Sequence, residues 1–316
     1  MKKLAITISA ILASSAAYAG NEALTQLQFA VGDDIEITQN TTHANPSLGN
    51  DANVYMTSTY KNDTVILQEG NENLAEVDAD FARYSEFDIT QTGNENKAYI
   101  NAQGVFNVDN DLDITQTGNG NVSTISVDDG DFNDADVDVA GNGNTTTAEF
   151  NGGSADDNHI KTFIDNGDDN TVSSVVNSGA DNDAHVYVIN SNDNILNTTQ
   201  NGDDNRVYVA ATGGSNDNEV DVTQSEDNYA LVDVYWGSAE NDIDITQDDN
   251  NEAYVRVGFM SSDNTIDIEQ TAYNSDASVG LLGSSSNEIS VWQNSNDSAV
   301  VTGFYSYGNS VNIIQN

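Results

Sequence analysis

The stretch that decides the fold is Asn241-Asp242-Ile243-Asp244-Ile245-Thr246-Gln247, in which apolar and polar residues alternate. Side chains of a β-strand point alternately to the two faces of its sheet. Ile243 and Ile245 therefore share one face with the two terminal amides, while Asp242 and Asp244 share the other. The alternation predicts a strand with one buried face, which begins with asparagine and ends with glutamine.

The glutamine of this stretch belongs to a column that recurs along the chain. Its members stand at positions 39, 68, 91, 116, 200, 224, 247, 270, 293 and 315. Between positions 116 and 200 we align Val139 and Asp165 with the column. A second polar position precedes each member by six residues, and its members are Asp33, Asn62, Ser85, Asn110, Asn133, His159, Asn194, Asn218, Asn241, Asn264, Asn287 and Asn309. A period near 23 residues is the signature of a repeat architecture.

Each repeat contains a second strand after a turn. Thr92-Gly93-Asn94-Glu95 is rich in residues that tolerate a positive φ, as a turn requires. Asn96, Ala98, Ile100 and Ala102 then alternate with polar residues in a second strand-like run. The repeat is therefore expected to be a strand, a turn, a strand and a turn.

Stacking of these repeats predicts an all-β fold, a two-sheet parallel β-solenoid with rungs of about 23 residues. A lone two-stranded unit is not stable in water, and stacking it in register gives an amyloid-like cross-β stack with a rise of about 4.7–4.8 Å. A buried amide is costly unless it is hydrogen-bonded, and a column lets each amide donate to the next. We expect this amyloid-core ladder to comprise Asn62, Gln68, Ser85, Gln91, Asn96, Asn110, Gln116, Asn121, Asn218, Gln224, Asn241, Gln247, Asn264, Gln270, Asn287, Gln293, Asn309 and Gln315.

Two segments break the period. The interval 40–61 contains Pro46, the single proline of the chain, and we interpret it as an inserted loop. The segment 182–200 contains an additional strand-like run, 184–189. It is either a long loop or a slip of half a turn that divides the stack into two blocks.

Composition argues against a nucleic-acid partner and excludes disulfide bonds. With 52 acidic and 8 basic residues, the formal net charge is −44. A nucleic-acid partner needs a basic surface, so none is expected. The chain has no cysteine and hence no disulfide.

The N-terminus has the pattern of a secretory signal peptide. Lys2 and Lys3 precede the apolar stretch 4–12, and Ala17-Tyr18-Ala19 fits a cleavage site after Ala19. We expect residues 1–19 to be removed, 20–32 to form an N-terminal segment and 33–316 to form the repeat domain. No later segment is apolar enough to be expected to span a membrane.

The sequence predicts no catalytic, cofactor or metal site. His43 falls in the inserted loop, His159 at an inward ladder position and His185 in the irregular segment, so no catalytic triad is expected. The acidic turns 167–170 and 202–205 carry oxygen ligands that suit calcium. They lack a calcium-binding repeat motif, and the sequence favours solvated acidic turns.

The segment Ser85–Ala98, SEFDITQTGNENKA, resembles a curlin repeat. Ser85, Gln91, Gly93 and Asn96 stand where that family has its serine, glutamine, glycine and asparagine, and 110–121 fits as well. The chain departs from the family pattern because apolar residues replace the second glutamine, at Ala79, Ala102, Val127, Phe150, Val176, Ala211 and Val257. We regard the chain as a long, acidic and divergent curlin-like protein.

The resemblance implies a secreted structural subunit that self-associates into extracellular functional-amyloid fibres of a biofilm matrix and supports adhesion. By the same resemblance its partners would be a nucleator subunit, an outer-membrane secretion channel and periplasmic chaperones. Uncapped solenoid ends present unpaired backbone groups, so we expect copies to add head to tail. The alternative is a monomeric cell-surface β-solenoid that acts as an adhesin or ligand-binding module.

Overall fold

The computed structural model of the chain describes residues 20–41, 48–80, 83–103, 110–128, 133–151 and 157–316. Every named element in these residues is a β-strand. The chain divides into two compact units, Met1–Asn158 and His159–Asn316, which we describe in turn. Within the described part of the chain, no helix is long and apolar enough to cross a membrane.

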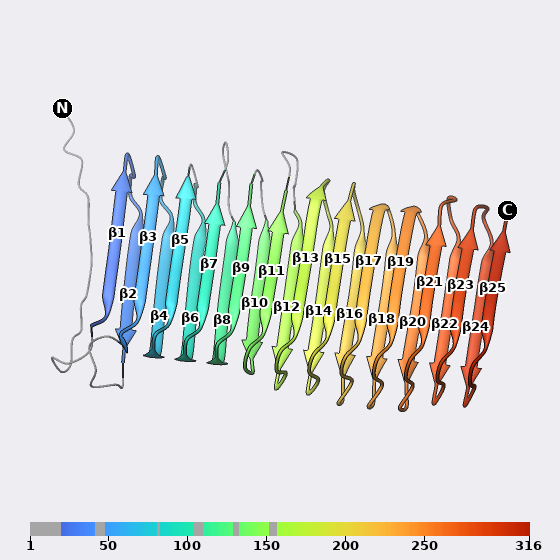
Figure 1. The fold of residues 1–316 in the computed structure, drawn as a ribbon. Helices are drawn as coiled ribbons and strands as arrows, with labels where there is room; N and C mark the ends of the chain where they lie inside the picture. Colours follow the sequence, from blue (N-terminus) through green and yellow to red (C-terminus); the bar gives the residue numbers. More distant parts are fainter. Residues whose placement is uncertain (1–19, 42–47, 81–82, 104–109, 129–132, 152–156) are drawn as a thin grey trace. The chain divides into compact units, whose positions relative to one another are not determined.

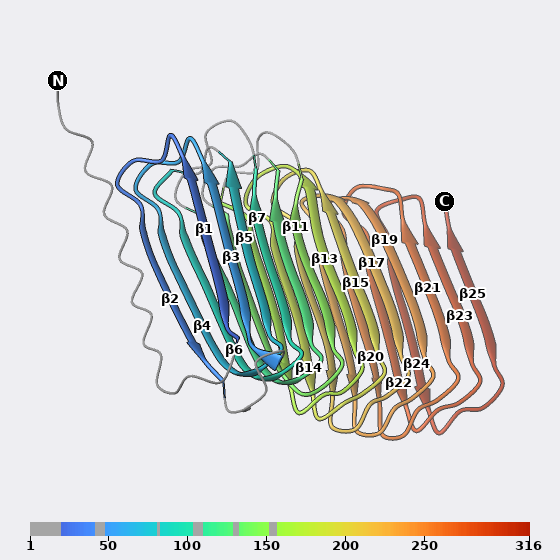
Figure 2. The same ribbon diagram turned by 60° about the vertical axis from the view of Figure 1, so that its left-hand side comes forward.

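In the first unit, successive strands alternate between two sheets (Figure 1 and Figure 2). The odd-numbered strands of one sheet are β1 (Glu22–Gln28), β3 (Asp51–Thr57), β5 (Leu74–Asp80), β7 (Lys97–Ala102), β9 (Val122–Val127) and β11 (Thr145–Phe150). The even-numbered strands of the other are β2 (Asp34–Asn40), β4 (Asp63–Asn71), β6 (Glu86–Asn94), β8 (Asp111–Asn119) and β10 (Asp134–Ala140). All neighbouring strands within these two sheets pair in parallel.

The second unit has the same architecture. Its even-numbered strands are β12 (His159–Asp165), β14 (Asp183–Ile189), β16 (Arg206–Thr212), β18 (Tyr229–Tyr235), β20 (Glu252–Gly258), β22 (Asp276–Leu282) and β24 (Ser298–Phe304). Its odd-numbered strands are β13 (Thr171–Ser178), β15 (Ile195–Asn201), β17 (Glu219–Glu226), β19 (Asp242–Asp249), β21 (Thr265–Gln270), β23 (Glu288–Gln293) and β25 (Ser310–Gln315). Neighbours are again parallel, and the predicted two-sheet parallel β-solenoid is confirmed.

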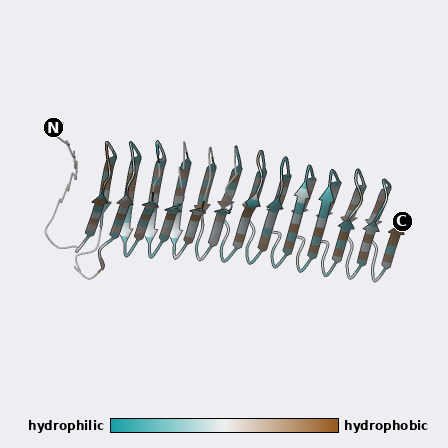
Figure 3. Cartoon of the chain, turned by 90° about the horizontal axis from the view of Figure 1, so that it is seen from above, coloured by the Kyte–Doolittle hydropathy of each residue, from teal (hydrophilic) through white to brown (hydrophobic). Residues whose placement is uncertain are grey.

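The core of each unit is made by like residues stacked in register. Ile66, Ile89 and Ile114 pair in succession on β4, β6 and β8, and all three are buried. Apolar and polar bands alternate along the strands (Figure 3). The apolar side chains of each strand are therefore removed from water. Burial of apolar surface is the main favourable term in the free energy of folding.

A column of glycines lies one residue before the ends of β4, β6 and β8 in the first unit. Gly70 pairs with Gly93, and Gly93 pairs with Gly118. The φ angles of these three glycines are 120°, 119° and 123°, a region that L side chains rarely adopt. A Cβ atom on Gly93 would lie 1.8 Å from the carbonyl oxygen of Gly118. The turn requires glycine both for its backbone conformation and for the close approach of the next rung.

Two paired strands, β1 and β3, lie in segments where the sequence analysis expected no repeat strand. β1 lies within the segment 20–32, before the expected start of the repeats, and pairs with β3. β3 itself lies in the interval 40–61 that was interpreted as an inserted loop. Pro46, His43 and residues 1–19, including the predicted cleavage position Ala19, lie outside the described residues.

The alignment between Gln116 and Gln200 is wrong beyond Val139. Val139 pairs with Gln116 as expected, but on β12 the buried residue is Ile164, and Asp165 is partly exposed. Gln116 lies on an even-numbered strand and Gln200 on an odd-numbered one. The glutamine column has slipped by half a rung, which was one of the two interpretations of segment 182–200. The loop interpretation is wrong, because β14 is a regular strand paired with β12 and β16.

Candidate functional site: columns of buried amides

The glutamines of the repeat form hydrogen-bonded columns inside each unit. Gln68 donates from Nε2 to Oε1 of Gln91 at 2.9 Å, and Gln91 donates in the same way to Gln116 at 2.9 Å. In the second unit, Gln247 donates to Gln270 at 3.0 Å. Every one of these bonds runs towards the next rung along the chain, so each column has a direction.

The second proton of each glutamine amide joins the two sheets. Nε2 of Gln68, on β4, donates to the carbonyl oxygen of Asp51, on β3, at 2.9 Å. Nε2 of Gln247, on β19, donates to the carbonyl oxygen of Tyr229, on β18, at 3.1 Å. A single glutamine thus connects its own rung internally and also binds the next rung, which satisfies a group that would be costly to bury alone.

The glutamine column of the first unit ends at Gln116, where other groups take over its hydrogen bond. Beyond Gln116 the next inward residue is Val139, which offers no acceptor. Nε2 of Gln116 keeps the bond to the other sheet, to the carbonyl oxygen of Lys97 at 2.9 Å, and donates to Oγ of Ser123 at 2.9 Å in place of the missing glutamine. The loss of glutamine in the next rung is therefore compensated locally.

The asparagines form parallel columns that run in the opposite direction. Asn264 donates from Nδ2 to Oδ1 of Asn241 at 2.8 Å, and Asn241 donates to Asn218 at 2.8 Å. Nδ2 of Asn241 also donates to the carbonyl oxygen of Ser261 in the following rung at 3.2 Å. Each asparagine therefore binds the rungs on both sides of it.

Nearly all the residues expected in the ladder lie in the interior. Those with side chains removed from water are Asn62, Gln68, Ser85, Gln91, Asn96, Asn110, Gln116, Asn121, Asn218, Gln224, Asn241, Gln247, Asn264, Gln270, Asn287 and Gln293. Asn309 is exposed and Gln315 is partly exposed. Asn309 still donates to Asn287 at 2.9 Å, and Gln315 accepts from Gln293 at 2.9 Å.

Sequence reasoning missed two sets of ladder residues. Asn96 and Asn121 were expected, but the buried asparagines Asn50, Asn73 and Asn144 of the same column were not, nor were Asn182 and Asn205 of its counterpart in the second unit. Buried serines form a column in the turns of the second unit, at Ser191, Ser215, Ser238, Ser261 and Ser284. In that column the backbone N–H of Ser284 donates to Oγ of Ser261 at 3.1 Å. The signal was present, because each of these serines stands three residues before an asparagine of the ladder.

Removing one amide from the column is expected to cost more than removing an outward charge. Gln247→Leu leaves Nε2 of Gln224 without its acceptor at 3.0 Å and Oε1 of Gln270 without its donor. We expect a loss of about 1–3 kcal/mol in the free energy of unfolding, measured with urea. Asp244→Asn, three residues away and facing outward, is the matched control and is expected to be neutral or slightly stabilising. Equal losses for the two variants would contradict the assignment of inward and outward faces.

Acidic residues stack on the outer face as regularly as amides stack inside. Asp88, Asp113 and Asp136 pair in succession on β6, β8 and β10. Partial burial, together with the neighbouring carboxylates of Asp111, Asp88 and Asp136, raises the pKa of Asp113 to about 7. In the second unit, burial and the neighbouring Asp267 likewise raise the pKa of Asp244.

The raised pKa of Asp113 predicts that stability falls as pH rises. Below about pH 4 the carboxyl is protonated in both the folded and unfolded chain, since its ordinary pKa is 3.8. As pH rises towards 7, the unfolded chain loses this proton first, and the folded state becomes progressively less favoured. Asp113→Asn should raise the melting temperature at pH 8 and change it little at pH 4, as measured by circular dichroism. An equal shift at both pH values would show that the effect is not electrostatic.

His159 and His185 do not lie where the sequence placed them. His159 was expected to point inward, but the buried residue is Asn158, and the side chain of His159 is partly exposed. His185 lies on the regular strand β14. Burial alone would raise the pKa of Asp183, but hydrogen bonds to His159 and His185 hold it well below its usual range. Asp183 is therefore ionised between two imidazole rings, an arrangement that the incorrect register had hidden.

The acidic turns considered for calcium carry exposed carboxylates. Asp168, Asp169, Asp203 and Asp204 are all exposed. Within the residues that the structure describes, these carboxylates do not belong to a cluster of three or more metal-ligating side chains.

Comparison with protein families was made on the sequence. The family model described as the curlin-associated repeat matches residues 61–93. These residues comprise β4, the following turn, β5 and most of β6, including Gln68 and Gln91. The chain therefore carries a curlin-like repeat. The matched repeat is similar to that of curli-type fibre subunits. A search of curated proteins gave no match.

Proposed function

We propose that the chain is a secreted structural subunit that self-associates into extracellular cross-β fibres. The observation that carries this proposal is the in-register stack of amide columns, in which Gln68 donates to Gln91 and Gln91 to Gln116. Columns of identical amides add to the backbone hydrogen bonds that hold cross-β fibrils together between chains. The curlin-like repeat at residues 61–93 supports the same conclusion.

The direction of the columns favours head-to-tail assembly. A glutamine column donates at one end and accepts at the other, so two copies that continue it must present unlike faces. Contacts between unlike faces do not close on themselves and propagate as filaments. Copies stacked in the same register extend both sheets and both kinds of amide column without a new type of contact.

The setting of this function is proposed from the same resemblance. Residues 1–19 would direct export and be removed after Ala19, and the fibres would lie at the cell surface and support adhesion and biofilm formation. A nucleator subunit, an outer-membrane secretion channel and periplasmic chaperones would be its partners. The amide columns offer no nucleophile or general base, so the proposed role is not enzymatic.

Assembly of the purified chain distinguishes this proposal from a monomeric surface adhesin. The chain lacking residues 1–19 is diluted from denaturant into buffered salt, and sedimentation and thioflavin fluorescence are followed over days. We expect polymers that bind thioflavin and shorten the lag phase of fresh protein when added as seeds. A chain that stays monomeric at high concentration, with and without seeds, would support the adhesin instead.

A further inference from the structure

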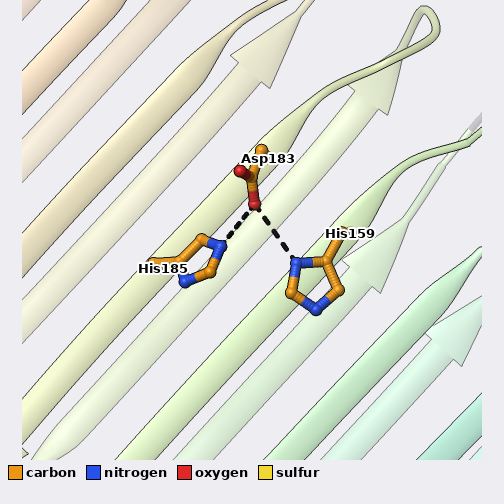
Figure 4. A group of neighbouring side chains, drawn as sticks. All are labelled: His159, Asp183 and His185. Atoms are coloured by element: carbon orange, nitrogen blue, oxygen red, sulfur yellow. Dashed lines mark hydrogen bonds and ion pairs between the residues drawn. The ribbon is translucent and has the colours of Figure 1, made fainter.

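Two of the three histidines of the chain meet at one carboxylate in the second unit (Figure 4). His159 on β12 pairs in register with Asp183 on β14. His185 follows Asp183 by two residues and therefore projects from the same face of β14. In a chain with so few histidines, composition alone does not account for this meeting.

The three side chains offer ligand atoms that converge. Oδ1 of Asp183 lies 3.2 Å from Nδ1 of His159 and 2.6 Å from Nε2 of His185. One ligand atom from each residue lies within 4.8 Å of the others. The side chains are 26–32% exposed, so the cluster can be reached from solvent.

A neighbouring hydroxyl fixes the ring of His185. Its Nδ1 atom lies 3.0 Å from Oη of Tyr187, two residues further along the same face. An outer hydrogen bond of this kind orients an imidazole and leaves its other nitrogen directed at the ligand position. Here that other nitrogen is Nε2, which points to Asp183.

We propose that His159, Asp183 and His185 form a binding site for one divalent transition-metal ion such as Zn²⁺. Imidazole nitrogens suit zinc, copper and nickel, whereas calcium and magnesium take oxygen ligands almost exclusively. Three protein ligands leave a fourth position of a tetrahedral zinc ion for water. The net charge of −44 raises the local concentration of any cation near the protein.

Two of the three separations between ligand atoms need only small side-chain movements to suit zinc. Two ligands of a tetrahedral zinc ion lie about 3.3 Å apart, given bonds of about 2.0–2.1 Å. The separation of 3.2 Å between His159 and Asp183 already matches this value. The separation of 2.6 Å between His185 and Asp183 must open by about 0.7 Å to reach it. The strands hold the backbone in place, so rotation of the carboxylate and the ring supplies this change.

Arg206 is expected to compete with a metal ion for the carboxylate of Asp183, and its substitution gives a second test of the site. Its Nε atom lies 3.4 Å from Oδ2 of Asp183, and its side chain is 66% exposed. A metal ion and a guanidinium compete for the same carboxylate. Arg206→Gln should therefore tighten zinc binding by about two- to fivefold, the range expected from the loss of an exposed ion pair.

Calorimetric titration of the full chain with zinc chloride tests the site. The titration is run with calcium in excess, so that calcium occupies the weak cation positions on the acidic surface. Under this condition we expect one zinc ion to bind per chain. His159→Gln and His185→Gln should each weaken binding at least about tenfold, because each removes a direct ligand. His43→Gln, which removes the third histidine, should leave the affinity unchanged. Affinity that is the same in all three variants would overturn the proposal and assign zinc to the acidic rows.

Chemical modification of the unaltered chain gives an answer even if a variant fails to fold. Diethyl pyrocarbonate modifies accessible imidazoles, and mass spectrometry identifies the modified residues. Zinc should lower the modification of His159 and His185 and leave that of His43 at its zinc-free level. Equal modification of all three histidines with and without zinc would contradict the site.

Discussion

Gly93→Ala is expected to destabilise the first unit by about 3–5 kcal/mol, the largest effect of any single substitution considered. The alanine methyl would lie 1.8 Å from the carbonyl oxygen of Gly118, and neither the oxygen nor the Cα that carries the methyl can move far, because the stacked strands fix the backbone. The φ of 119° adds strain that a glycine does not have. Urea unfolding of the purified variant, followed by circular dichroism, measures the loss.

Gly120→Ala is the matched control for this prediction. Gly120 also has a positive φ, 67°, but a Cβ atom there would have no neighbour within 4 Å. We expect a cost of only about 1–2 kcal/mol, the usual penalty of a left-handed conformation for an L residue. If the two substitutions cost the same, the close approach of Gly93 to the next rung does not exist in solution.

Fibre growth is expected to be about 10–100 times faster in 1 M than in 0.01 M sodium chloride at pH 7. Acids that stack in register, such as Asp221, Asp244 and Asp267, stand about one rung apart, or about 4.8 Å. Like charges at this distance repel by about 1 kcal/mol per pair even in water. Two or three such pairs at a new contact between copies would slow growth by about 10–100 times in 0.01 M salt. Salt removes this repulsion, because the Debye length falls from about 30 Å at 0.01 M to about 3 Å at 1 M.

Thioflavin fluorescence in seeded reactions measures this rate, with calcium chloride and acidification to pH 5 as further ways to reduce the repulsion. Sucrose at matched osmolarity is the control for effects unrelated to charge. A rate that is flat or falls with salt would mean that copies do not join with their acidic rows in register.

The sequence predicted the fold because alternation and period act on every rung. Alternation predicted which face of each strand is buried, and the amides on that face predicted a stack, since only stacking can satisfy them. The direction of the columns could not be predicted, because it depends on which way each amide turns. Asn96 and Asn121 were predicted, but the other asparagines of their column were overlooked because the glutamine column drew attention to the opposite strand of each rung.

The errors have a single physical source. Each rung contains two strands with nearly the same alternation, so an alignment can slip by one strand and keep all its apolar positions. Only the glutamine marks the difference, and between Gln116 and Gln200 there is none in a strand. The slip displaced Asp165 and His159 from their true faces. It also separated His159 from Asp183, which are register partners in the structure.

X-ray fibre diffraction from aligned assemblies of the chain tests the central claim most directly. A stack that continues from copy to copy predicts a meridional reflection at about 4.7–4.8 Å and an equatorial reflection at about 10 Å, from strands perpendicular to the fibre axis. A preparation in which the chain stays monomeric, or in which the reflection at about 4.7–4.8 Å lies on the equator, would contradict it.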